Sequence, residues 1–334
     1  REHYEAVRER PDDYALWLSY ARALELAGDA DTAIAAARRA IPLAPAYAQP
    51  HYQLGNLLLR SGQTTEAFSE LRLAGISDPS LLPGIIDLAW RVSSNNVQFV
   101  EQALLPTTPE QHWALARFFK EQQQIDPAIR HFAMSGAEAE PDRRAYVQHL
   151  IEAGNFAAAA ELWKVDNPEG IQPDIVRNPG FEKEVDLGAA SFDWNAPQSL
   201  EGVRFTLDTQ MPAEGKSALK LEFTGSAPVG VPMLSQIILV APQTQYELHF
   251  SARPESIVSA GLPQVSVLEP LSRNHIAQSQ TFGGTSGAWS EYVITFASGP
   301  AQAVQIVVER QSCLTNPCPI FGRLWLDGFR LTKR

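Results

Sequence analysis

The 334-residue sequence has few of the features that mark metal, redox or membrane proteins. It contains only two cysteines, Cys313 and Cys318, and its seven histidines are scattered along the chain. No apolar run approaches the ~18 residues of a membrane-spanning helix, so we expect no membrane span in this part of the protein. The motifs of phosphate-binding loops, zinc peptidases and serine hydrolases are missing as well.

Basic residues are also scarce. The chain has 27 Lys and Arg against 38 Asp and Glu, a formal charge of −11, and neither half carries a basic stripe. Nucleic-acid binding requires clustered positive charge, so we expect no nucleic-acid partner. The length allows two domains, each large enough for its own core.

The two cysteines flank the sequence Leu-Thr-Asn-Pro. A pair this close around Asn-Pro can close a turn as a disulfide, which would indicate an oxidising, extracytoplasmic compartment. The alternative is two reduced thiols in a loop. The first residue is Arg1 rather than Met, so we expect a processed piece of a longer protein.

The Ala-rich first half repeats with an offset of 34 residues. The matched positions are Ala33 and Ala67, Ala37 and Leu71, Ala40 and Ala74, Pro45 and Pro79, Leu24 and Leu58, and Gly28 and Gly62. This pattern resembles the tetratricopeptide repeat (TPR), in which small residues let paired helices approach. The resemblance implies an α-helical solenoid over residues 1–165.

The repeat pattern is incomplete at two places. Ala6 and Pro11 occupy the end of a unit, so the first repeat is truncated, which predicts a longer array upstream. The third unit is interrupted at Ser93–Asn96, and the offset from the second to the fourth unit is 61. We therefore expect an irregular third repeat about seven residues short.

In the TPR family the concave groove is lined by the first helix of each pair. The matching positions are Arg22, Tyr52, Asn56, Arg60, Trp113, Arg117, Arg144 and Gln148. Arginine and aromatic side chains suit peptide capture, although a merely solvated face is the alternative. Asn56 matches one residue of a C-terminal carboxylate clamp, but the other clamp residues are missing.

Residues 166–174 form a proline-containing linker, and β-strand patterns follow. Short alternating or apolar segments occur at Ser217–Phe223, Ser235–Val240, Gln245–Ala252, Val265–Leu268, Trp289–Phe296, Ala303–Glu309 and Arg323–Leu331. Seven or more short strands without intervening helices predict an antiparallel β-sandwich over 175–334.

Five landmarks occur in order: NPGFE at 178–182, GKSALKL at 215–221, YELHFSAR at 246–253, WSEYVITF at 289–296 and LWLDGFRL at 324–331. Together they resemble the jelly-roll carbohydrate-binding modules of the xylanase- and cellulase-associated type, a galactose-binding-like sandwich. The resemblance implies a structural calcium near the joined ends, with Glu182 and Asp327 at matching positions. Each carboxylate can equally be structural.

Sugar binding requires an exposed aromatic face and polar groups beside it. The family pattern places Trp194 and Trp289 in the core. Trp325 alternates with Leu324 and Leu326, so it points to the opposite face and is the preferred aromatic. Arg253, Glu269, Gln305 and Arg310 are the candidate polar partners.

These patterns predict a non-catalytic, two-part protein. The repeats would bind a protein or peptide, and the sandwich would bind a poly- or oligosaccharide, in keeping with a bacterial envelope component that assembles or exports polysaccharide. One alternative is a protein-interaction scaffold whose jelly roll no longer binds sugar. The other is a glycan-active hydrolase or lyase, for which the sequence identifies no carboxylate pair.

Overall fold

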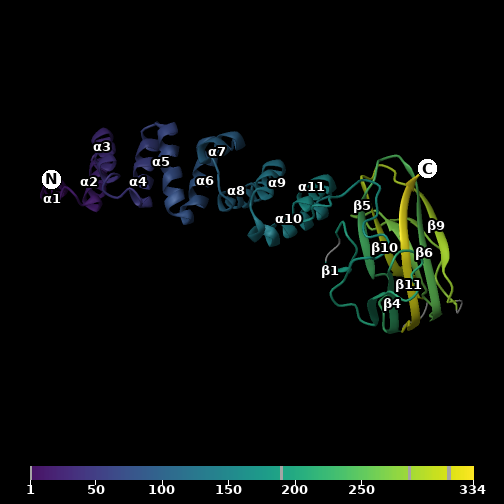
Figure 1. Cartoon of the computed structure of the whole chain (residues 1–334). Coiled ribbons are helices and arrows are strands. Elements are labelled where there is room, and N and C mark those ends of the chain that lie inside the picture. Colours follow the sequence, from purple (N-terminus) through teal and green to yellow (C-terminus); the bar gives the residue numbers. More distant parts are fainter. Residues whose placement is uncertain (1, 189–190, 285–286, 314–316) are drawn as a thin grey trace. The chain divides into compact units, whose positions relative to one another are not determined.

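A computed structural model describes residues 2–188, 191–284, 287–313 and 317–334 (Figure 1). Helices precede strands along the chain, and the chain separates into two compact units, Arg1–Pro141 and Asp142–Arg334. The predicted order of a helical part followed by a β-sandwich is confirmed.

The first unit is a series of antiparallel helix pairs. Its helices are α1 (Glu2–Glu9), α2 (Tyr14–Leu26), α3 (Ala30–Ala40), α4 (Ala48–Arg60), α5 (Thr64–Ser77), α6 (Leu82–Val92), α7 (Val97–Leu104), α8 (Pro109–Glu121) and α9 (Ile125–Ala133). Short 3₁₀ turns lie at Pro79–Leu81 and Ala137–Ala139. Helices α10 (Glu140–Glu152) and α11 (Phe156–Asp166) follow.

The helix boundaries reproduce the 34-residue period. Helices α2 and α4 both have 13 residues and begin at Tyr14 and Ala48, and both end before a glycine with positive φ, Gly28 at 81° and Gly62 at 78°. Such glycines end helices without Cβ strain. The third pair, α6 and α7, is short, and α8 begins 61 residues after α4, as the sequence predicts.

Close helix packing explains the small residues. A Cβ placed on Gly55 of α4 would lie 2.7 Å from Cγ of Leu71 on α5. Ala21, Ala33 and Ala37 are fully buried in the core of the first two pairs. The small residues that recur every 34 positions therefore lie where two helix backbones come close together.

The sandwich consists of two sheets. Its strands are β1 (Asp186–Leu187), β2 (Asn195–Ala196), β3 (Val203–Asp208), β4 (Ala218–Gly225), β5 (Leu234–Leu239), β6 (Gln245–Val258), β7 (Pro263–Leu268), β8 (His275–Gln278), β9 (Ser290–Ala297), β10 (Ala303–Arg310) and β11 (Ile320–Lys333). One sheet has the order β1-β2-β5-β10-β7-β8 and the other β3-β4-β11-β6-β9. All pairings are antiparallel except β1 with β2.

The opening and closing motifs pack together in the core. The Phe181 and Phe329 rings are 5.9 Å apart, and Trp194 lies 4.9 Å from Phe329. The backbone N–H of Phe329 donates to the carbonyl of Pro179 at 3.0 Å. The predicted core position of Trp194 is confirmed, since its side chain is buried in this cluster.

Helix α11 belongs to the same compact unit as the sandwich. The Trp163 ring lies 6.2 Å from Phe192, and the Arg177 guanidinium stacks over Trp163 at 4.7 Å. At the α10–α11 turn, a Cβ on Gly154 would lie 3.0 Å from Leu271, in the β7–β8 turn. The second unit therefore begins at Asp142, ahead of the linker at 166–174.

Candidate functional site

Trp325 lies on the outer face of the five-stranded sheet. Leu324 and Leu326 on either side of it are in the core, so the alternation of β11 directs Trp325 away from the core, as predicted. Its neighbours in register are Lys220 of β4 and Arg253 of β6. The indole is nevertheless only 4% exposed, so other side chains cover it.

Arg253 stacks on this indole. Its guanidinium carbon lies 3.9 Å from the Trp325 ring centre and 5.5 Å from that of Trp289. Trp325 Nε1 donates to Asp208 Oδ2 at 2.7 Å, and Lys220 Nζ lies 5.9 Å from the Trp325 ring. We call these five residues, Asp208, Lys220, Arg253, Trp289 and Trp325, the Trp–Arg cluster.

The structure corrects the predicted role of Trp289. Its side chain is half-buried outside the core, its Nε1 donates to the carbonyl of Met211 at 3.0 Å, and its ring faces Arg253. Trp289 precedes β9, whose first residue is Ser290, so strand alternation does not determine its direction. The second aromatic of the site is therefore one that the sequence assigned to the core.

In the cluster, Asp208 accepts hydrogen bonds, whereas Arg253 donates none to the described residues. Asp208 Oδ1 accepts the backbone N–H of Gln210 at 2.9 Å, and that bond, with the one from Trp325, lowers the pKa of the Asp208 carboxyl. Arg253 is 6% exposed, and within the described residues it forms no hydrogen bond or ion pair; its Nε is buried without a partner. The cluster thus holds a buried cation beside a carboxylate that attracts it by charge but is hydrogen-bonded to Gln210 and Trp325.

Ion pairs lie to one side of the cluster, two residues along the strands from Trp325 and Lys220. Arg323 Nη1 lies 3.0 Å from Glu255 Oε1 and its Nε 3.6 Å from Glu222 Oε1, and Arg204 lies 3.9 Å from Glu222. Phe321 is an exposed aromatic farther along the same strand, β11. These charges are already paired with one another, so the polar groups beside the two indoles are those of the Trp–Arg cluster itself.

The other predicted polar partners belong to the six-stranded sheet. Gln305 of β10 is buried and pairs in register with Leu268 of β7. Glu269 follows β7 and accepts a hydrogen bond from Ser272 Oγ at 2.5 Å. The structure therefore brings Trp325 and Arg253 together but places Glu269, Gln305 and Arg310 on a different sheet.

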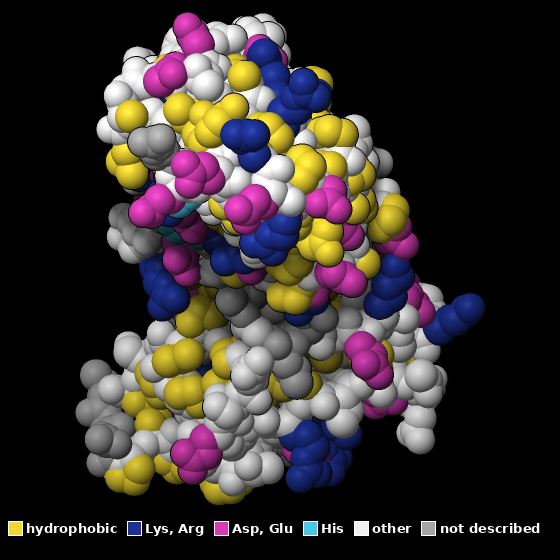
Figure 2. Space-filling view, turned by 90° about the vertical axis from the view of Figure 1, so that its left-hand side faces the viewer, with side chains coloured by type: hydrophobic (Ala, Val, Ile, Leu, Met, Phe, Trp, Pro, Cys, Tyr) yellow, Lys and Arg dark blue, Asp and Glu magenta, His cyan; other side chains and the backbone are white. Residues whose placement is uncertain are grey.

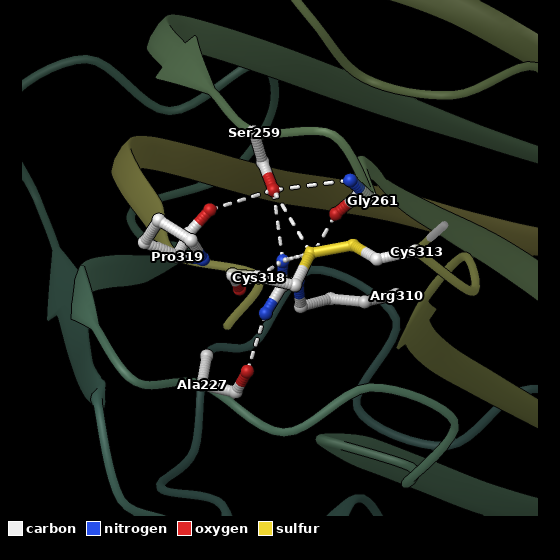
Figure 3. Close-up of a disulfide and its surroundings, with 7 residues drawn as sticks. All are labelled: Ala227, Ser259, Gly261, Arg310, Cys313, Cys318 and Pro319. Carbon is white, nitrogen blue, oxygen red and sulfur yellow. Dashed lines mark hydrogen bonds between the residues drawn. A yellow bond between two sulfur atoms is a disulfide. The ribbon is translucent and has the colours of Figure 1, made fainter. Parts of the chain in front are cut away.

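Arg310 holds a loop in place (Figure 3). Its Nε donates to the carbonyl of Gly261 at 3.0 Å, its Nη1 to that of Ala227, and its Nη2 to Ser259 Oγ at 2.8 Å and to the carbonyl of Cys318 at 3.0 Å. Burial lowers the pKa of this guanidinium. The side chain serves the disulfide loop and is not directed at solvent.

Cys313 and Cys318 form a disulfide, as the sequence predicted, with their Cα atoms 6.2 Å apart. Arg310 Nη2 lies 3.0 Å from Cys318 Sγ. A Cβ on Gly261 would lie 2.6 Å from Cys313 Sγ, so glycine is required where this chain segment passes the sulfur. The cross-link is thus built into the loop after β10.

Glu182 and Asp327 both lie beside Gly180, where the opening and closing motifs pack together. A Cβ on Gly180 would lie 3.3 Å from Asp327 Oδ1 and 3.6 Å from Glu182 Oε1, so both carboxylates border one point. Asp327 is fully buried; its Oδ2 accepts the N–H groups of Ala213 and Glu214, the N–H of Gly328 also acts on the carboxyl, and Oδ1 has no partner in hydrogen-bond geometry among the described residues. Burial, together with the nearby Glu214 carboxylate, raises the pKa of Asp327.

A buried carboxylate oxygen with two further carboxylates nearby fits a hard cation. Among the described residues, no three His, Cys, Asp or Glu side chains form a ready-made metal cluster. A cation at this point would therefore need backbone carbonyls or water as additional ligands.

The predicted groove residues occupy four helices. Tyr52, Asn56 and Arg60 share a face of α4 at four-residue spacing, with Tyr52 39% exposed and Arg60 paired with Glu25 of α2. Arg22 lies on α2, Trp113 and Arg117 lie on α8, and Arg144 and Gln148 lie on α10, within the second compact unit. Figure 2 shows side chains of both charge signs interspersed with apolar ones on one side of the molecule.

No protein-family model and no curated protein matches the sequence. Among solved structures, a CBM4 module is 13% identical, with 48% of this chain and 99% of that chain covered and a TM-score of 0.36. The CBM22-1 xylan-binding domain of Paenibacillus barcinonensis Xyn10C is 13% identical, with 49% and 97% covered and a TM-score of 0.33. These carbohydrate-binding modules resemble the C-terminal half.

The helical half resembles YrrB, a TPR protein with an unusual peptide-binding site, at 15% identity, with 49% of this chain and 90% of that chain covered and a TM-score of 0.28. Likenesses at these identities concern the fold alone. No helix in the described parts of the chain is long and apolar enough to cross a membrane.

Proposed function

We propose that this chain is a non-catalytic binding protein whose β-sandwich binds a poly- or oligosaccharide on the outer face of the five-stranded sheet. The Trp–Arg cluster carries the proposal. Two indoles gathered outside the core, with charged and polar side chains around them, have no role in holding the two sheets together. They provide apolar ring faces and hydrogen-bonding groups side by side.

We further propose that the helical repeats bind a protein or peptide. Tyr52, Asn56 and Arg60 present an aromatic ring, an amide and a guanidinium along one helix face, the kind of side chains that dominate binding energies. A peptide that binds this chain should bind at least tenfold more weakly to Tyr52→Ala. An unchanged affinity would assign binding to another face.

The disulfide supports an extracytoplasmic location, because such bonds persist in oxidising compartments. Together with a saccharide site and a peptide site, this location suits a bacterial envelope component in the assembly or export of polysaccharide. At the ends of the sandwich, Glu182 and Asp327 would hold a structural calcium, which would neutralise the buried carboxylate.

The test of saccharide binding is isothermal titration of the whole chain with a panel of soluble plant and bacterial polysaccharides. Trp289→Ala should abolish binding while the melting temperature stays near that of the wild type, because this side chain is half-buried. Phe321→Ala is the matched control, since it removes an exposed aromatic from the same face. If the chain binds no saccharide of the panel, the sandwich is a protein-interaction domain instead.

A further inference from the structure

Arg253 combines two properties that rarely occur together in a folded protein. It is only 6% exposed, and none of the described residues accepts a hydrogen bond from its side chain. Burying a charge without a partner is costly, and stacking on Trp325 and Trp289 offsets only part of that cost. Among the described residues, the guanidinium therefore has ring and charge contacts, with Trp325, Trp289 and Asp208, but no hydrogen-bond acceptor.

Neighbouring arginines provide an internal comparison. Arg323, on the same face, contacts both Glu222 and Glu255, and Arg204 contacts Glu222. The sheet thus pairs these exposed arginines with carboxylates, whereas no described carboxylate forms a salt bridge or hydrogen bond with the buried Arg253. A purely structural Arg253 would be expected to have the opposite arrangement, because the buried charge gains most from a partner.

Asp208, the carboxylate of the cluster, attracts Arg253 through its charge but accepts no hydrogen bond from it. Asp208 uses Oδ1 for the N–H of Gln210 and Oδ2 for Trp325 Nε1. Lys220 adds a second cation beside the Trp325 ring. The cluster therefore carries one positive charge in excess, at the centre of the face on which a saccharide would lie.

We propose that the saccharide bound by this face is acidic, and that its anionic group pairs with Arg253 between the two indoles, with Lys220 contributing at the rim. This inference rests on the proposed function and adds the chemical class of the ligand. A guanidinium held in a plane by ring stacking presents paired N–H groups to a carboxylate or a sulfate, and such charge-assisted bonds are strong in a desolvated site. The sugar ring would contact the accessible part of Trp289.

The experiment compares acidic polysaccharides with uncharged forms of the same backbone. Polygalacturonate, alginate and hyaluronan are titrated into the whole chain beside their carboxyl-reduced derivatives, and dextran sulfate is titrated beside dextran. Binding should be confined to the acidic members, and it should weaken as NaCl concentration rises. The uronates and the sulfated polymer distinguish the two possible anionic groups.

Arg253→Gln should weaken binding on the order of tenfold to a hundredfold, the range for losing a hydrogen bond to a charged group. Lys220→Gln should weaken it by a few-fold. Arg323→Gln is the matched control, because it removes an equal charge from the same face, and affinity should remain within about twofold, as expected for an exposed pair.

Stability provides a second, independent readout. Arg253→Met keeps the side chain's contact with the indoles and removes the buried charge. The melting temperature of the ligand-free chain should therefore rise. A fall of several degrees would show that Arg253 is structural and would overturn the inference. Equal binding of acidic and neutral polymers would also overturn it and leave the proposed function intact, whereas no binding of any polysaccharide would remove both.

Discussion

The buried carboxylate of Asp327 allows the proposed cation to be tested by its effect on stability. The oxygen without a partner is fully enclosed, and Glu182 and Glu214 lie close by. Without a cation, an unsatisfied buried charge lowers stability by more than the ~1–3 kcal/mol of a neutral polar group. Calcium at 100 times its dissociation constant would add about 2.7 kcal/mol. For a unit of this size that corresponds to a rise of about 5 to 11 °C in melting temperature.

Scanning calorimetry of the whole chain in excess calcium and in chelator measures this difference. Asp327→Asn should abolish the calcium response, because a neutral amide replaces the buried charged ligand. In chelator the same variant should melt no lower than the wild type, since the amide oxygen can accept the N–H groups of Ala213 and Glu214. Glu201→Gln, which removes an exposed carboxylate elsewhere in the unit, should keep the full response.

The pH dependence has a defined sign. The folded pKa of Asp327 is raised, so the folded chain binds the proton more tightly than the unfolded chain does. In chelator, the destabilisation is complete above the raised pKa and disappears as pH falls to about 4. The wild type should therefore gain stability relative to Asp327→Asn as the solution is acidified. A wild-type melting temperature that is the same in calcium and in chelator would refute this reasoning. A calcium response that survives in Asp327→Asn would also refute it.

Two further predictions concern the scaffold. Gly55→Ala should lower the unfolding free energy of the helical unit by about 1–3 kcal/mol, because its Cβ would overlap the facing helix, whereas Gly84→Ala, where a Cβ meets open space, should raise it by up to about 1 kcal/mol. Urea unfolding measures the unfolding free energy of each variant, and equal changes in Gly55→Ala and Gly84→Ala would contradict the packing argument. Cys313→Ser should lower the stability of the sandwich by about 2 kcal/mol, and a reducing agent should lower the wild type to the same melting temperature.

Most of the fold could be predicted because periodicity records backbone geometry. The offset of 34 between Gly28 and Gly62 is the spacing of two helix ends, and both adopt the left-handed conformation. The alternation around Trp325 gave its direction correctly. Strand β3 was missed although Val203 and Leu207 alternate with polar residues, because its side chains are only partly buried at a sheet edge.

The composition of the site could not be predicted, because alternation gives the face of a strand but not the sheet to which the strand belongs. Arg253 and Arg310 both end apolar segments and look equivalent in sequence. In the fold, β6 pairs with β11 and so places Arg253 beside Trp325, whereas β10 lies between β5 and β7 in the other sheet. The family pattern assigned Trp289 to the core, but Trp289 lies one residue before β9, which begins at Ser290.

Arg253 and Arg310, both buried in the sandwich, therefore make a decisive comparison. Arg310 is 2% exposed and donates to the carbonyls of Ala227, Gly261 and Cys318, so Arg310→Met would leave three acceptors without their donor. At ~1–3 kcal/mol for each buried group left unpaired, it should destabilise the sandwich by several kcal/mol. Arg253→Met removes a guanidinium that satisfies no hydrogen-bond acceptor in the described parts of the chain and should not destabilise it. If calorimetry shows equal losses for the two variants, burial alone explains both side chains, and Arg253 is not held ready for a ligand.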